Sequence, residues 1–299
     1  MKTRTVIPIP PSFDKNQNLD IISVSKYVKY LENKGACTVM TTAGTSQYNL
    51  LDIDEIHSLN KTIVDSFKGS KILGVPALAT RSAIKFIEEA EDNYVDENTR
   101  LMCLYPDRFY SSKTIQDYFL SLRSVSSDPL YIHGMFMRSG TGGNWDFDSA
   151  TLKSLINKGV VEGMKEENSS LAASFGFVDD IRGFSESFDI IVAGGSMRRH
   201  QFLANAGANS FLAGVGNFFP EIEISYCQKL DDGKSITKEI ELETDLFRVF
   251  NQYGWHKSLR IGLSELQLGC SYDRKPWPAR QEKACKDIAS ILETIRNKK

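Results

Sequence analysis

Eight short apolar runs, rich in β-branched residues, recur along the chain, and their pattern predicts eight strands. They cover Thr5–Ile9, Cys37–Thr42, Lys71–Leu78, Arg100–Tyr105, Pro129–Met135, Val160–Lys165, Phe188–Ala193 and Ser210–Val215. Between these runs lie segments of helical period, in which apolar residues return every three or four positions, as they do from Ile53 to Phe67. Alternation of strands and helices predicts parallel strands that are joined by crossover helices.

Eight repeats favour the α/β fold class, with a closed (β/α)8 barrel, also called a TIM barrel. The alternative is an open, doubly wound sheet, but no G-x-G-x-x-G phosphate loop follows the first predicted strand. We therefore expect the barrel to occupy residues 1–222. The rest of the chain has helical patterns without further strand signals, so residues 223–299 are expected to form a C-terminal helical extension.

The composition restricts the partners of the chain. Its 299 residues suit one large barrel, and a net charge of −2 gives no basic surface for nucleic acid or an anionic membrane. No run reaches the roughly 18 apolar residues of a membrane span, and the proline-rich N-terminus does not resemble a signal peptide. A cytoplasmic protein is expected. Five cysteines without a CxxC pair predict neither a metal site nor a dithiol centre.

One lysine stands out because it lies in the sixth apolar run. Strand period places Val161, Gly163 and Lys165 on one face. If that face is the barrel interior, the lysine is buried beside a glycine that leaves room for a ligand. Burial favours a neutral amine, which can attack a ketone. The alternative is an exposed cation at the strand end, or a lysine that pairs with Glu166 or Glu167 on a helix.

Two other strand ends carry groups suited to a substrate, because active sites of such barrels lie at the carboxyl ends of the strands. In the fifth run, Tyr131 and His133 share a face, and Arg138 follows. The second run leads into the small-residue turn Ala43–Gln47. The backbone N–H groups of such a turn are suited to holding a carboxylate.

Three blocks of the chain resemble the dihydrodipicolinate synthase / N-acetylneuraminate lyase superfamily, in the family's order and spacing. The turn Ala43–Gln47 is similar to the family's G-[ST]-T-G-E motif, and Val161–Glu166 is similar to its V-x-G-[IM]-K-[ED] strand. The segment Ala206–Asn217 resembles a later strand, G-A-D-G-x-I-S. The resemblance covers nearly the whole chain. It implies that Lys165 forms an imine with a 2-oxo acid.

The resemblance also implies roles for other residues. Thr45 matches the hydroxyl residue that binds the 2-oxo acid carboxylate, whereas Gly44 stands at a second hydroxyl position and offers only its backbone N–H. Gly195 matches a small residue beside the substrate, and Leu212 matches a position whose backbone carbonyl lies near the imine. Arg138 matches an arginine at the mouth of the site that meets the second substrate.

The largest departure from the family is His133, which stands where the family has its proton-shuttling tyrosine. An auxiliary tyrosine is also replaced, by Asp107. A histidine can transfer protons near neutral pH, since its pKa of about 6.5 suits acid–base work. The alternative is that His133 only packs or hydrogen-bonds in the barrel. Tyr48 and Tyr105 are further candidate hydroxyl donors.

The resemblance therefore implies a class I Schiff-base lyase or aldolase that acts on pyruvate or a sugar-derived 2-oxo acid by aldol cleavage, condensation or dehydration. No cofactor is expected beyond the covalent imine with Lys165. Dihydrodipicolinate synthesis itself is disfavoured, because the tyrosine pair is missing. The alternative function is a family member with altered catalysis that binds a 2-oxo acid as a sensor or scaffold. The family also implies a homotetramer or homodimer.

Overall fold

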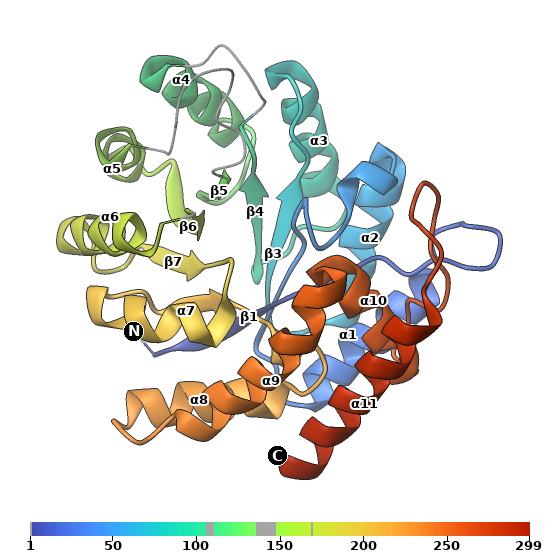
Figure 1. The fold of residues 1–299 in the computed structure, drawn as a ribbon. Helices are drawn as coiled ribbons and strands as arrows, with labels where there is room; N and C mark the ends of the chain where they lie inside the picture. The colour runs from blue at the N-terminus through green and yellow to red at the C-terminus, as the bar shows by residue number, and fades with distance from the viewer. Residues whose placement is uncertain (1, 106–110, 136–147, 169) are drawn as a thin grey trace. The chain divides into compact units, whose positions relative to one another are not determined.

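A computed structural model describes residues 2–105, 111–135, 148–168 and 170–299. Its strands follow one another in chain order around a closed barrel. Figure 1 traces the chain from its N-terminus to its C-terminus. The eight strands are β1 (Arg4–Pro8), β2 (Thr38–Met40), β3 (Ser70–Val75), β4 (Thr99–Cys103), β5 (Leu130–Met135), β6 (Val161–Glu167), β7 (Asp189–Val192) and β8 (Ser210–Leu212). Each strand overlaps one of the eight predicted runs, and the strands close into a barrel, so the predicted fold class is confirmed.

Helices alternate with these strands in the sequence. They are α1 (Ile21–Asn33), α2 (Ile53–Ser66), α3 (Thr80–Asn93), α4 (Ser112–Arg123), α5 (Ser149–Asn157), α6 (Leu171–Phe184) and α7 (Ser196–Leu203). After β8 come α8 (Pro220–Asp231), α9 (Thr237–Tyr253), α10 (Trp255–Glu265) and α11 (Glu282–Lys298). The helical pattern predicted for the C-terminal part is confirmed. The boundary between residues 222 and 223 stays a prediction.

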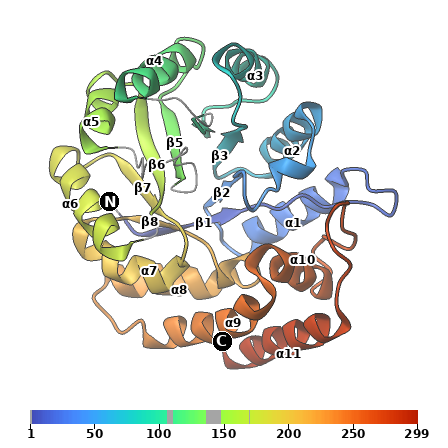
Figure 2. The ribbon, with the colours of Figure 1, turned by 45° about the horizontal axis from the view of Figure 1, so that its top comes forward.

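The chain divides into two compact units. One comprises residues 72–212, and the other combines residues 2–71 with residues 213–299. In the first unit, helices α3 to α6 lie on the outer side of the strands, which Figure 2 shows. Their buried faces explain this arrangement: α3, for example, buries Ala83, Phe86, Ile87 and Ala90 at helical spacing.

An extra residue sets the register between β5 and β6. Leu130 pairs with Val161, but the next residue, Tyr131, pairs with Gly163, so Glu162 is left without an opposite residue. Such a bulge changes which side chains stand opposite each other further along the strands. From this point Tyr131 faces Gly163 and His133 faces Lys165.

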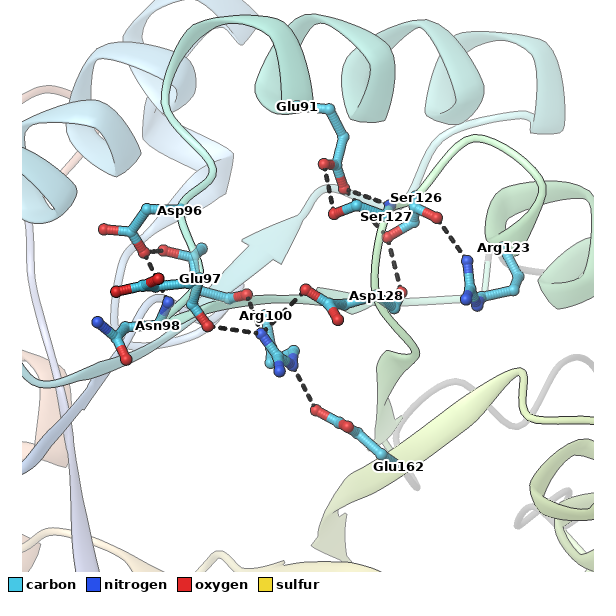
Figure 3. Close-up of polar contacts among 11 residues, drawn as sticks. Glu91, Asp96, Glu97, Asn98, Arg100, Arg123, Ser126, Ser127, Asp128 and Glu162 are labelled. Carbon is cyan, nitrogen blue, oxygen red and sulfur yellow. Dashed lines mark hydrogen bonds and ion pairs between the residues drawn. The ribbon is translucent and has the colours of Figure 1, made fainter.

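The starts of β4, β5 and β6 share a polar cluster, shown in Figure 3. Arg100 Nε donates to Glu162 Oε1 at 2.7 Å, and Arg100 NH1 lies 3.1 Å from Asp128 Oδ2. Nearby, Glu91 accepts hydrogen bonds from the backbone and side chain of Ser127. In barrels of this kind this end of the strands contributes stability, while chemistry occurs at the opposite end. Arg100 thus holds the bulge residue Glu162 at the structural end.

The second unit contains a buried arginine on α10. Arg260 is 1% exposed, and its Nε donates to Asp273 Oδ1 at 2.6 Å. Its other nitrogens donate to the carbonyl oxygens of Pro11 at 2.6 Å and Tyr272 at 2.5 Å. The guanidinium also lies over the ring of Phe13, with 5.1 Å between its central carbon and the ring centroid. One side chain therefore ties α10 to the segment that follows β1.

Replacing Arg260 by leucine should lower the free energy of unfolding by about 3 kcal/mol, because it leaves the half-buried Asp273 carboxylate and two carbonyl groups short of donors. The measurement is the shift of the urea unfolding midpoint. The matched control is Arg248→Leu, whose side chain is 70% exposed and pairs with Asp245 at 3.2 Å, and which should change stability by less than about 0.5 kcal/mol. Equal midpoint shifts for the two variants would contradict the assignment.

Candidate active site

Lys165 lies near the carboxyl end of β6, with its side chain buried among polar partners. The residue is 3% exposed, and its Nζ lies 2.7 Å from His133 Nε2 on β5. The same Nζ donates to Glu167 Oε2 at 2.6 Å. The interpretation of Lys165 as an exposed cation or a helical residue is therefore wrong. The strand register places Lys165 opposite His133.

Glu167 belongs to this cluster and was not predicted as a site residue. The strand extends two residues past the predicted end at Lys165, so Gly163, Lys165 and Glu167 share one face. Glu167 Oε2 also lies 3.0 Å from His133 Nε2, so one carboxylate oxygen contacts both other groups. The signal that could have found Glu167 is the strand period itself, continued by one more step.

The three side chains differ in their access to solvent. The side chain of His133 is 1% exposed and that of Lys165 is 4% exposed, whereas that of Glu167 is 36% exposed. Burial alone would raise the pKa of Glu167, but the charge of Lys165 and the hydrogen bond from His133 outweigh it and hold that pKa well below its usual range. Glu167 is therefore an ionised carboxylate at neutral pH, and it is the member of the cluster that water reaches.

The neighbouring Glu166 points to the other side of β6. Its Oε1 accepts hydrogen bonds from Ser174 Oγ at 2.7 Å and from the backbone N–H of Asn168 at 2.8 Å. Its Oε2 lies 3.3 Å from Arg199 NH2 on α7. These contacts hold helices α6 and α7 against the strand. Adjacent glutamates thus serve different purposes because the side chains of a strand alternate.

Gly163 makes room for a tyrosine and not for a ligand, so the expectation from the sequence was wrong. A Cβ atom at Gly163 would lie 2.2 Å from Tyr131 Cε1. The Tyr131 hydroxyl donates to Asp189 Oδ2 at 2.9 Å, and Ser210 Oγ donates to Asp189 Oδ1 at 2.8 Å. The interior next to Gly163 is therefore filled by a hydrogen-bonded tyrosine and carboxylate.

Two further predicted residues lie in the same unit. Gly195 follows β7 at the start of α7, where a Cβ atom would lie 2.8 Å from Arg199 Cβ. Leu212 ends β8 and is half-buried. Both therefore follow or end a strand, as the prediction requires. Their proximity to a substrate stays a prediction.

Gly44 and Thr45 belong to the other unit, in a tight turn that follows β2. The turn is closed by a hydrogen bond from the Ser46 N–H to Thr42 O at 2.9 Å, and from the Gln47 N–H to Gly44 O at 3.0 Å. These bonds do not use the N–H groups of Gly44 and Thr45, and Thr45 is 4% exposed. The role of both residues in holding a carboxylate stays a prediction.

The remaining candidates have other surroundings. Arg138 and Asp107 lie outside the described residues. The Tyr48 hydroxyl donates to Thr41 Oγ1 at 2.9 Å, and the Tyr105 ring packs edge-on against Tyr118 with 5.1 Å between centroids. Sequence reasoning thus found two of the three residues of the Lys165 cluster.

Within the described ranges, no group of three or more His, Cys, Asp or Glu side chains is arranged to hold a metal ion. Among the helices of the same ranges, none is both long and apolar enough to cross a membrane.

The protein is a closed eight-stranded barrel in which a buried lysine of β6 lies beside a histidine and a carboxylate. This fold and this site define its class: a (β/α)8 barrel with a candidate imine-forming lysine. Residues 2–295 match the dihydrodipicolinate synthetase family. The chain belongs to that family. Its members are lyases of the class I aldolase type, so the predicted enzyme class is confirmed at the level of the family.

Individual relatives are distant in sequence. A curated 4-hydroxy-tetrahydrodipicolinate synthase from Karelsulcia muelleri is 23% identical over 250 residues, which cover 82% of this chain and 80% of that protein. A dihydrodipicolinate synthase structure from Bacillus anthracis is 15% identical with a TM-score of 0.85, covering 98% of both chains. A variant of 2-keto-3-deoxygluconate aldolase from Sulfolobus solfataricus, solved with pyruvate, is 20% identical with a TM-score of 0.82, covering 99% of this chain and 97% of the other. These structures share the fold.

Replacing Gly163 by alanine should destabilise the protein by about 1–3 kcal/mol, because the new methyl group would collide with the ring of Tyr131. Thermal unfolding followed by circular dichroism measures the effect. Gly176→Ala on α6 is the control, since a Cβ atom there has nothing within 4 Å and alanine favours a helix. Retention of full stability by Gly163→Ala would show that Tyr131 can move.

Proposed function

We propose that the protein is a class I Schiff-base lyase or aldolase, in which Lys165 forms an imine with pyruvate or a sugar-derived 2-oxo acid. The observation that carries this proposal is the buried Lys165 amine, held 2.7 Å from an imidazole nitrogen of His133. A nucleophilic lysine needs burial and an adjacent group that can move protons. Both conditions are met at this position of β6.

The chemistry follows from these groups. The neutral Lys165 amine attacks the ketone carbon, a C–N bond forms, and the former carbonyl oxygen leaves as water. The protonated imine then accepts the electron pair of a broken C–C bond, or of a C–H bond from which a proton is removed. His133 moves protons during these steps. Because the imine is the electron sink, the proposal includes no metal ion or organic cofactor.

The relatives support the substrate class. The aldolase from Sulfolobus solfataricus was solved with pyruvate, and its name describes a sugar-derived 2-oxo acid. Synthesis of dihydrodipicolinate remains disfavoured for this chain, because His133 occupies the family's tyrosine position. The Thr45 hydroxyl and the N–H groups of its turn are proposed, from the family resemblance, to hold the substrate carboxylate.

Reduction with borohydride in the presence of pyruvate tests the proposal. It should convert the imine to a stable secondary amine on Lys165, and peptide mass spectrometry locates the added mass. Lys71 on β3 is an internal control. Like Lys165 it is buried, with 1% of the residue exposed, but its Nζ donates to the Phe67 carbonyl oxygen. Its peptide should stay unmodified, and Lys165→Met should give no adduct.

Two outcomes separate the candidate functions. Failure of pyruvate and of a panel of sugar-derived 2-oxo acids to label Lys165 would overturn the proposal. Labelling without turnover of any aldol or dehydratase substrate would instead favour a protein that binds a 2-oxo acid as a sensor or scaffold.

Restoring a hydroxyl at residue 44 should strengthen the binding of pyruvate. Gly44→Ser should lower the concentration of pyruvate for half-maximal labelling by roughly 10-fold, since a hydrogen bond to a charged group contributes about 1.5–3 kcal/mol. A Cβ atom there would lie 3.4 Å from His256 Nε2, which is tight but possible. Gly44→Ala adds the same Cβ without the hydroxyl. Equal results for the two variants would argue against a carboxylate at this turn.

A further inference from the structure

The carboxylate of Glu167 has a position that the family motif does not assign, because the motif resembled by this strand ends at Glu166. One oxygen, Glu167 Oε2, lies 2.6 Å from Lys165 Nζ and 3.0 Å from His133 Nε2. Lys165 Nζ and His133 Nε2 are themselves 2.7 Å apart. The three groups therefore form a closed triangle of contacts around the nucleophilic nitrogen.

We propose that Glu167 is a catalytic residue of this site, which takes the proton that Lys165 must lose before it attacks the 2-oxo acid and returns it during imine formation. This inference rests on the proposed function. It assigns the first proton acceptor to Glu167 and the relay within the barrel to His133.

The geometry supports a direct transfer. A protonated Lys165 amine already donates to Glu167 Oε2 at 2.6 Å, so the transfer requires no rotation of either side chain. Transfer to Glu167 neutralises both partners at once, and so removes the attraction that keeps the carboxylate ionised. The transfer therefore leaves no unpaired charge between the two side chains.

Exposure favours Glu167 over His133 as the group that exchanges protons with water. The side chain of Glu167 is 36% exposed, whereas those of Lys165 and His133 are almost completely buried. A proton removed from the amine has to leave the site, or return to it, over many turnovers. Glu167 is the member of the triangle with a path to solvent.

The steps balance with these groups alone. Glu167 accepts a proton from the Lys165 ammonium, and the amine nitrogen forms a bond to the ketone carbon. The Glu167 carboxylic acid then protonates the resulting alkoxide directly or through His133. The carbinolamine hydroxyl leaves as water when it receives a second proton, which the nitrogen has given up through the same two residues. The products are one water molecule and a protonated imine, whose nitrogen keeps the third hydrogen of the ammonium, and Glu167 is a carboxylate again.

A different role for Glu167 predicts the opposite change in the rate of imine formation when the carboxylate is neutralised. If the carboxylate only held the ammonium in place, its neutralisation would make the free amine easier to form, and imine formation would become faster. If Glu167 is the proton acceptor, its neutralisation removes the acceptor and imine formation becomes slower. The direction of the change therefore separates the two roles.

The experiment follows exchange of the pyruvate methyl hydrogens for deuterium by proton NMR, because this exchange requires imine formation and its conversion to the enamine. Glu167→Gln keeps the shape of the side chain and should slow the exchange about 100-fold, in the range that acid–base groups contribute. Glu167→Asp keeps the charge at a longer distance, so its exchange rate should lie between those of Glu167→Gln and the unaltered protein. Glu91→Gln is the matched control, since Glu91 is also half-buried but accepts hydrogen bonds from Ser127, and it should exchange within twofold of the unaltered protein.

The outcomes are distinguishable. An unchanged or faster exchange by Glu167→Gln, with Lys165 still labelled by borohydride, would overturn the inference and leave the proposed function intact. Absence of Lys165 labelling in the unaltered protein would overturn both. Slower exchange counts in favour only if the thermal unfolding midpoint of Glu167→Gln shows a folded protein. If it does not, the Glu167→Asp variant decides, because an exchange rate equal to that of the unaltered protein would overturn the inference.

Discussion

The pairing between β5 and β6 is the constraint on which the candidate site depends. Side chains of a strand alternate between two faces, so a shift of one residue would turn Lys165 out of the barrel and Glu166 into it. The bulge at Glu162 sets the phase, because it places Tyr131 opposite Gly163 and therefore His133 opposite Lys165. Arg100 contacts the bulge residue at the far end of the same strand. The position of Lys165 is thus linked to an ion pair at the structural end of the barrel.

Three glutamates on β6 have different roles: alternation separates Glu167 from the other two, and position along the strand separates Glu162 from Glu166. Glu162 pairs with Arg100, Glu166 holds the helices outside the strand, and Glu167 contacts Lys165. Their charges are equal, but their surroundings differ. Only Glu167 shares its oxygen between a buried ammonium and an imidazole, and this explains why its pKa falls despite partial burial.

Sequence reasoning found the strands and the lysine because both leave local signals: an apolar β-branched run, and a charged residue within one. It missed Glu167 because the apolar run stops before it, while the strand continues through its pairing with Met135 on β5. The expectation that Gly163 leaves room for a ligand was wrong for a related reason. Which side chain fills the space above a glycine depends on the register of the neighbouring strand, and the bulge that sets this register has no clear local signature.

The family resemblance implies that His133 on β5 replaces a tyrosine, and the groups on the partner strand β6 bear on what this replacement does. A tyrosine, with an ordinary pKa near 10, holds its proton at neutral pH and works as a weak acid, whereas an ionised carboxylate starts as a base. Exchanging one for the other at a single position would reverse the direction of the first proton transfer. Here two strands supply the groups: β5 provides an imidazole at residue 133, and β6 provides a carboxylate two residues beyond the lysine. Within the proposed function, the imidazole can carry the proton in either direction, so the pair can give back to the departing oxygen the proton that it took from the amine. This is why, within that function, His133 and Glu167 are better treated as one acid–base unit than as two independent groups.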